Sequence, residues 1–185
     1  MATAVHGSDI LLNTDFSDGK THWRGDGQPD VTPLSGGKLV ITLDPDKWTA
    51  VSQRFSANAT ALKVIVRYSL SEDCSLGKTG DKLVPPLTSD ALNQICGVGS
   101  LINIPASEYE LWKVLVASGN MLVSEGIVSR INRSPSSDDS SGEKTYTANL
   151  NSWLGSFNDS TLCLCFPPGQ GSVALFEVKL LAPGQ

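Results

Sequence analysis

The chain has 185 residues, a length that suits a single domain spanning 1–185. Hydrophobic residues make up 40% and charged residues 18%, which supports a folded core and excludes a disordered chain. The formal net charge of −5 argues against a nucleic-acid or anionic-membrane surface, because such surfaces need clustered Lys and Arg.

Short alternating segments dominate the chain and predict β-strands. Residues 38–43 place Leu39, Ile41 and Leu43 on one face, and residues 49–55 turn Val51 and Phe55 inward. Residues 62–70 alternate in the same way. The pattern predicts further strands at 110–117, 120–131, 143–150, 161–166 and 172–181. In the last of these, a common face is predicted for Ala174, Phe176, Val178 and Leu180.

These elements predict an all-β fold, a two-sheet antiparallel sandwich, because about eight or nine strands are separated by turn residues. No segment keeps a helical apolar period over a useful length, so helix should be minor. Residues 71–109 break the rhythm as a long irregular excursion. Residues 134–142 are a polar, Ser-rich tip that we expect to be mobile.

The four cysteines fall into two groups. Cys163 and Cys165 share one face of a predicted strand and cannot easily bridge each other, which favours buried thiols. Cys74 and Cys96 lie in the irregular excursion, where a disulfide between them would stabilise the loop. Unpaired cysteines are the alternative reading there.

Catalytic and targeting signatures are missing. The chain has no Gly-x-Ser-x-Gly motif, and His22, the remaining histidine base, has no recognisable nucleophile beside it. We therefore expect a protein that is not an enzyme. The first residues show no signal peptide, and no apolar run approaches the ~20 residues that span a bilayer. The chain is thus expected to be soluble, or to have lost an export signal.

The segment from Ile10 to Trp23, with Asn13, Phe16 and Gly19 between them, resembles the opening signature of carbohydrate-binding modules in the galactose-binding-like jelly-roll superfamily. Residues 173–180 look like the closing strand of that family, and 48–55 and 62–70 are similar to its second and third main strands. Residues 71–145 have no counterpart. The resemblance implies a jelly roll that binds a glycan without catalysis, in an extracellular or periplasmic setting. Phe16 and Trp23 would pin the first loop onto the sandwich.

The resemblance also implies a structural calcium ion. In related modules such an ion often lies between the N-terminal turn and the closing strand, and hard cations need several oxygen ligands. The side chains that could supply oxygens here are Asn13, Asp15, Asp18 and Glu177. Glu177 departs from the Asp that is more usual at its position. The alternative is a set of turn caps with one solvated carboxylate.

A sugar-binding surface needs aromatic platforms, because pyranose C–H bonds stack on π faces, together with polar groups for the hydroxyls. Trp48 shares the outward parity of its strand and is the best platform, although packing beneath a loop explains it equally well. Trp112 shares parity with core positions. Tyr109 and Trp153 lie at predicted strand ends, where either role is open.

Two arginines complete the candidate ligand-binding set. Arg54 and Arg67 project from outward faces, where a guanidinium could bind hydroxyls or carboxylates or simply be solvated. The sequence thus predicts glycan binding as the main function. The competing hypothesis is a protein-interaction or architectural domain that uses residues 71–109 as its contact surface. Neither the glycan nor the oligomeric state follows from the sequence.

Overall fold

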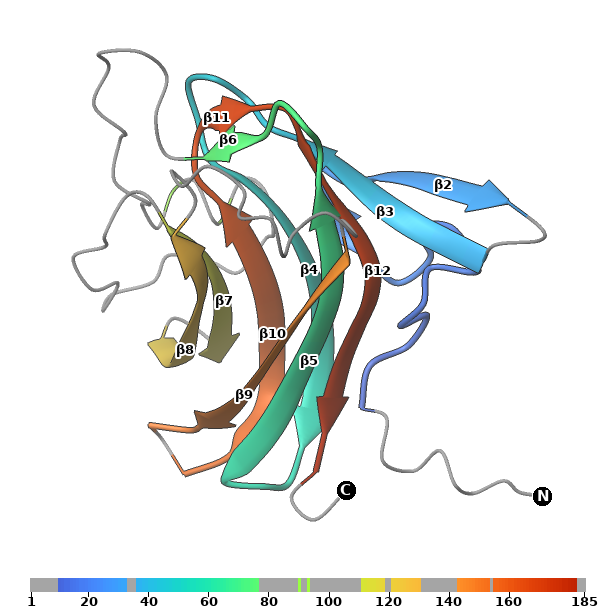
Figure 1. Cartoon of the computed structure of the whole chain (residues 1–185). Helices are drawn as coiled ribbons and strands as arrows, with labels where there is room; N and C mark the ends of the chain where they lie inside the picture. Colours follow the sequence, from blue (N-terminus) through green and yellow to red (C-terminus); the bar gives the residue numbers. More distant parts are fainter. Residues whose placement is uncertain are drawn as a thin grey trace.

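The computed structural model describes residues 10–32, 36–76, 90, 93, 111–118, 121–130, 143–153 and 155–182. Two five-stranded antiparallel sheets face each other, which confirms the predicted β-sandwich (Figure 1). The first sheet has the strand order β1 (Arg24–Gly25), β4 (Thr49–Ala57), β10 (Phe157–Phe166), β7 (Leu111–Ser118) and β8 (Met121–Arg130). The second has the order β2 (Gln28–Thr32), β3 (Gly36–Thr42), β12 (Ser172–Leu181), β5 (Ala61–Leu70) and β9 (Glu143–Asn151).

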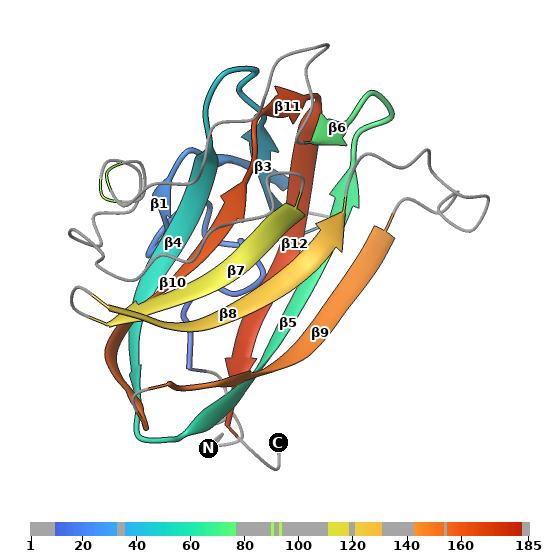
Figure 2. The ribbon, with the colours of Figure 1, turned by 90° about the vertical axis from the view of Figure 1, so that its left-hand side faces the viewer.

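A small two-stranded sheet of β6 (Ser75–Leu76) and β11 (Gly169–Gln170) lies at one end of the sandwich. The last strands of the two large sheets, β8 and β9, lie on the same side of the molecule (Figure 2), and the backbone nitrogen of Trp153, just after β9, donates to the carbonyl oxygen of Val123 on β8. The part of the chain that the model describes contains no helix with the length and hydropathy of a membrane span.

The core lies between the two sheets and is built from the alternate residues of each strand. Val51 and Phe55 of β4 point into it as predicted, and so do Leu39 and Ile41 of β3. On β5 the inward set is Leu62, Val64, Val66 and Tyr68. The eight strands predicted from alternation are all present, although β10 begins at Phe157 rather than at 161.

The prediction for the inward face of β12 was wrong in its first half. The buried residues are Val173, Leu175, Val178 and Leu180. A β-bulge between Leu175 and Glu177 adds one residue to this strand relative to β5, and this reverses the side-chain parity in mid-strand. Ala174 and Phe176 are therefore only partly buried.

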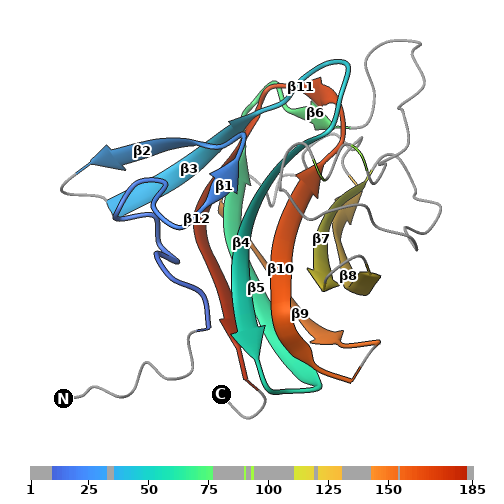
Figure 3. The ribbon, with the colours of Figure 1, turned by 180° about the vertical axis from the view of Figure 1, so that it is seen from behind.

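The N-terminal segment is fastened to both sheets (Figure 3). The buried side chain of Gln53 accepts a hydrogen bond from the backbone nitrogen of Leu12 at 2.7 Å and donates one to its carbonyl oxygen at 2.9 Å. On the other sheet, the backbone nitrogen of Val178 donates to the carbonyl oxygen of Thr14 at 2.9 Å. Gly37 of β3 is required beside this segment, because a Cβ there would lie 2.0 Å from the carbonyl oxygen of Phe16.

The outward face of the first sheet carries a second buried cluster, which consists of Trp48, Ala50, Leu115, Ala117, Leu122, Cys163 and Cys165. The two cysteines share this face as predicted, and both are buried. The thiol of Cys74 is partly buried, and burial, followed by the charge of Asp73, raises its pKa to about 11. Cys96, the partner proposed for Cys74, lies outside the described residues, as do most of 71–109 and all of 134–142.

Candidate functional site

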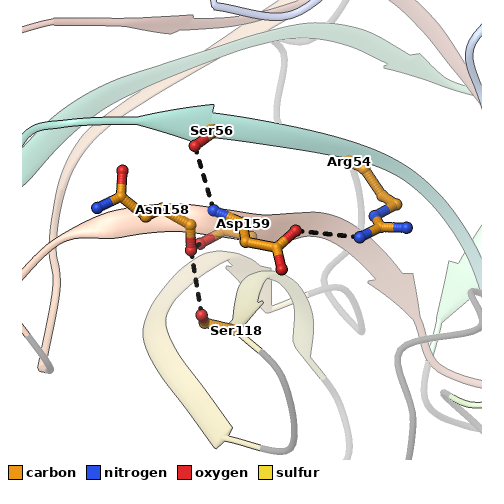
Figure 4. Close-up of polar contacts among 6 residues, drawn as sticks. Arg54, Ser56, Ser118, Asn158 and Asp159 are labelled. Carbon is orange, nitrogen blue, oxygen red and sulfur yellow. Dashed lines mark hydrogen bonds and ion pairs between the residues drawn. The ribbon is translucent and has the colours of Figure 1, made fainter.

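The end of the sandwich at the β9–β10 turn carries polar side chains from three neighbouring strands, and the turn itself carries the exposed Trp153. We call it the polar end surface and define it by Arg54, Ser56, Ser118, Trp153, Asn158 and Asp159. The strands β4 and β7 flank β10 in the first sheet, so residues near the ends of all three lie side by side (Figure 4).

Asp159 lies at the centre of this surface, at a β-bulge between Phe157 and Ser160. Its φ of 48° is left-handed, a conformation that residues other than glycine seldom adopt. The carboxylate oxygen Oδ1 pairs with Nη2 of Arg54 at 3.0 Å, and the backbone nitrogen donates to Oγ of Ser56 at 3.2 Å. Both contacts join β10 to β4 and fix the direction in which the carboxylate points (Figure 4).

Asn158 connects β10 to β7 through its backbone. Its backbone carbonyl oxygen accepts hydrogen bonds from Oγ of Ser118 at 3.2 Å and from Oγ of Ser160 at 3.3 Å. Its side-chain amide donates to Oγ of Ser156 at 3.3 Å and is exposed to solvent. Consecutive exposed residues therefore present an amide and a carboxylate, which together can both donate to and accept from hydroxyl groups.

Trp153 has a fixed backbone and an exposed side chain. Its backbone nitrogen donates to the carbonyl oxygen of Val123 on β8 at 2.8 Å. The preceding residue, Ser152, donates from its backbone nitrogen to Thr60 and from its hydroxyl to the carbonyl oxygen of Ser156 at 2.6 Å. The side chain is nevertheless 56% exposed, and among the residues whose burial is described it is the one exposed large aromatic side chain.

Of the ligand-binding residues predicted from the sequence, the structure brings Arg54 and Trp153 to this surface. Trp48 is only 3% exposed, in the cluster on the outward face of the first sheet, so the packing interpretation applies and its indole forms no open platform. Arg67 lies on the outer face of the second sheet, where it pairs with Glu143 at 2.8 Å.

The side chains of the two remaining candidates, Trp112 and Tyr109, are not among those that the structure describes. The backbone of Trp112 belongs to β7 and pairs with Ser129, whereas Tyr109 lies outside the described residues. Sequence reasoning missed Ser56, Ser118, Asn158 and Asp159. The polar run Asn158-Asp159-Ser160 ahead of a predicted strand was the available signal, but alternation alone does not reveal a bulge.

Three of the four residues proposed for calcium, Asn13, Asp15 and Glu177, use their side chains for contacts within the protein. The amide nitrogen of Asn13 donates to the carbonyl oxygens of Gly19 and Thr21 at 3.1 and 2.9 Å, and its Oδ1 accepts from the backbone nitrogen of Asp18 at 3.0 Å. An amide nitrogen thus lies at the point toward which two loop carbonyls converge. A cation that used these carbonyls would have to displace it.

Two of the three carboxylates proposed for calcium make other contacts. Asp15 accepts hydrogen bonds from the hydroxyl and the backbone nitrogen of Ser17, and these contacts lower its pKa. Glu177 pairs with Arg67 and Lys179 on the outer face of the second sheet. Within the described ranges, no three His, Cys, Asp or Glu side chains are grouped as metal ligands. Calcium binding therefore stays a prediction of the resemblance.

Neither a protein-family model nor a curated protein matches the sequence. Solved structures do match the fold. A family 61 carbohydrate-binding module in complex with β-1,4-galactotriose is similar over 94% of this chain and 98% of its own, with a TM-score of 0.51 and 9% identity. A family 16 carbohydrate-binding module is similar over 94% of this chain and 99% of its own, with the same TM-score and identity.

A third structure shows the same fold inside a larger protein. The enzymatically active domain of tailspike protein 4 from bacteriophage CBA120 is similar over 93% of this chain and 21% of its own, with a TM-score of 0.52 and 9% identity. The chain therefore has the jelly-roll fold of carbohydrate-binding modules, as the resemblance of its two ends implied. At this level of identity the likeness shows the fold and leaves the function to be argued from the site.

Proposed function

We propose that this chain, a jelly roll of the carbohydrate-binding-module type, is a non-catalytic glycan-binding module. The observation that carries the proposal is the likeness over nearly the full length of both chains to a module bound to β-1,4-galactotriose. Fold alone does not transfer a function, so the proposal needs a surface that suits a sugar.

The polar end surface offers both parts of such a site. The exposed indole of Trp153 can stack on the C–H face of a pyranose ring, and Asn158 and Asp159 can pair with hydroxyl groups. The outward face of the first sheet is a poorer choice, because its described apolar residues, Trp48 included, are already buried. We therefore place the glycan at the β9–β10 end.

The first test is Trp153→Ala, assayed by affinity electrophoresis through gels that contain individual polysaccharides. We expect the wild type to be retarded by at least one of them. The variant should lose about tenfold or more in affinity, equivalent to about 1.4 kcal/mol, because the platform for stacking is removed. Val31→Ala is the matched control, since Val31 is also an exposed apolar residue but lies on β2 in the other sheet.

Three results would count against the proposal. A broad panel without any retardation would favour the interaction-domain hypothesis. Equal losses in Trp153→Ala and Val31→Ala would remove the site from the polar end surface. Turnover of chromogenic glycosides by the pure protein would contradict the non-catalytic assignment.

A further inference from the structure

We infer that the polar end surface selects neutral over acidic glycans, and that Asp159, held in place by Arg54, accepts the hydrogen bonds of the sugar hydroxyls. The inference rests on the proposed function and names the class of ligand. It starts from the charges at this end of the molecule.

Two charged side chains occur in residues 54–60, 116–118, 121–124, 151–153 and 155–161, the described segments next to the polar end surface. They are Arg54 and Asp159, and they pair with each other at 3.0 Å. The remaining side chains of the surface are hydroxyls, amides and the Trp153 indole. A uronate or sulfate group therefore gains no net attraction here, and it would meet the Asp159 carboxylate as a like charge.

The ion pair has little value for stability. The side chains of Arg54 and Asp159 are 80% and 83% exposed, and pairs this exposed contribute little because water and salt screen them. Left-handed backbone at a residue other than glycine costs of the order of 1 kcal/mol, although Asp tolerates it better than most. An exposed pair on a strained bulge is better explained by ligand binding than by folding.

The geometry also prepares Asp159 for a ligand. Arg54 engages Oδ1, while the exposed carboxylate keeps further lone pairs toward solvent, where two neighbouring hydroxyls of a sugar can donate. Hydrogen bonds to an ionised acceptor are stronger than those between neutral groups. Because Arg54 and Ser56 already fix the residue, little conformational entropy remains to be lost on binding.

The test compares neutral β-1,4-galactan, xylan and soluble cellulose with polygalacturonate and alginate, at roughly 0.02 M and roughly 0.5 M NaCl. We expect retardation by a neutral polymer, a change of less than about twofold in affinity between the two salt concentrations, and no retardation by the acidic polymers. Asp159→Asn should weaken neutral binding by about tenfold, because it replaces the charged acceptor.

Arg54 is tested as a residue that positions the carboxylate of Asp159. Arg54→Ala should weaken binding several-fold, and Arg54→Lys should recover most of the loss, because a cation remains beside Asp159. Glu143→Gln is the matched control, since Glu143 also forms an exposed ion pair, with Arg67 at 2.8 Å, on the outer face of the second sheet. All four variants should keep the wild-type melting temperature to within about 2–3 °C.

The outcomes separate the inference from the proposed function. Binding of acidic polymers that weakens steeply with salt, without binding of neutral ones, would overturn the inference and leave a glycan-binding module. Wild-type affinity in Asp159→Asn would remove the role given to Asp159. Absence of binding to every polymer would overturn the inference together with the proposed function.

Discussion

The side chain of Asn13 organises the N-terminal loop at the scale of a single residue. Its side-chain amide contacts three backbone groups of the loop, and the backbone carbonyl oxygen of Asn13 accepts a hydrogen bond from the indole nitrogen of Trp23 at 3.0 Å. Trp23 in turn packs on Phe16, with ring centroids 5.3 Å apart. With φ of 50°, position 13 is left-handed, a conformation that Asn tolerates and Ala does not.

Replacement of Asn13 should therefore destabilise the protein. Asn13→Ala leaves loop carbonyls and one backbone nitrogen without their partner and adds strain, for a cost of about 1–3 kcal/mol. In a chain of this length, that corresponds to a fall of roughly 3–10 °C in melting temperature. Asn149→Ala, at an exposed position of β9, is the control. Equal melting curves for both variants would contradict the role assigned to Asn13.

Chelation tests whether the loop also needs calcium. The loop carbonyls of Gly19 and Thr21 already have a donor in Asn13, so we expect wild-type protein treated with EDTA to melt at an unchanged temperature. A fall of several degrees that added calcium reverses would show that a metal stabilises the folded state, as the resemblance implies.

At the scale of the element, the first sheet is buried on both faces over part of its area. Its inward residues, such as Val51 and Leu164, join the main core, while Trp48 and Leu115 lie in the outward cluster. Alternation predicted the parity of β4 correctly. It could not predict that the outward residues would be buried, because parity gives the direction of a side chain and not what covers it.

Trp48 should accordingly affect stability and not affinity. Trp48→Ala is expected to cost about 3–5 kcal/mol, the usual range for removing a buried tryptophan. Since that loss can prevent folding, Trp48→Phe is the companion variant, with a smaller fall in melting temperature. Folded Trp48→Phe should be retarded by polysaccharide as strongly as the wild type. Lost affinity at an unchanged melting temperature would instead make Trp48 a ligand-binding residue.

The errors of the sequence analysis fall where strands are irregular. Strict alternation placed Phe176 inward, but the bulge of β12 turned Val178 and Leu180 to the core with Val173 and Leu175. Asp159 lies at the bulge of β10, before the predicted start of this strand, and was therefore not predicted as a site residue. An extra residue in one strand depends on pairing with its neighbour, so the sequence of the strand alone does not reveal it.

At the scale of the whole molecule, the fold was recognised mainly from the sequences at the two ends of the chain. Residues 10–23 form the loop that Gln53 and β12 hold, and residues 173–180 form the strand that receives it. Both are dictated by packing and by backbone hydrogen bonds, and the fold that they build is shared with a known module at 9% identity. The ligand surface depends on exposed side chains that packing does not constrain, and of the four predicted residues whose side chains are described, Arg54 and Trp153 lie there.

The most direct test of the account is an amide NMR titration of the whole chain with a neutral oligosaccharide such as β-1,4-galactotriose. We predict that the largest shifts fall on the indole N–H of Trp153 and on backbone amides of residues 54–60, 118 and 155–160. Shifts centred on the outer face of the second sheet, around Arg67 and Glu177, would contradict the account, and so would a spectrum that no neutral oligosaccharide changes.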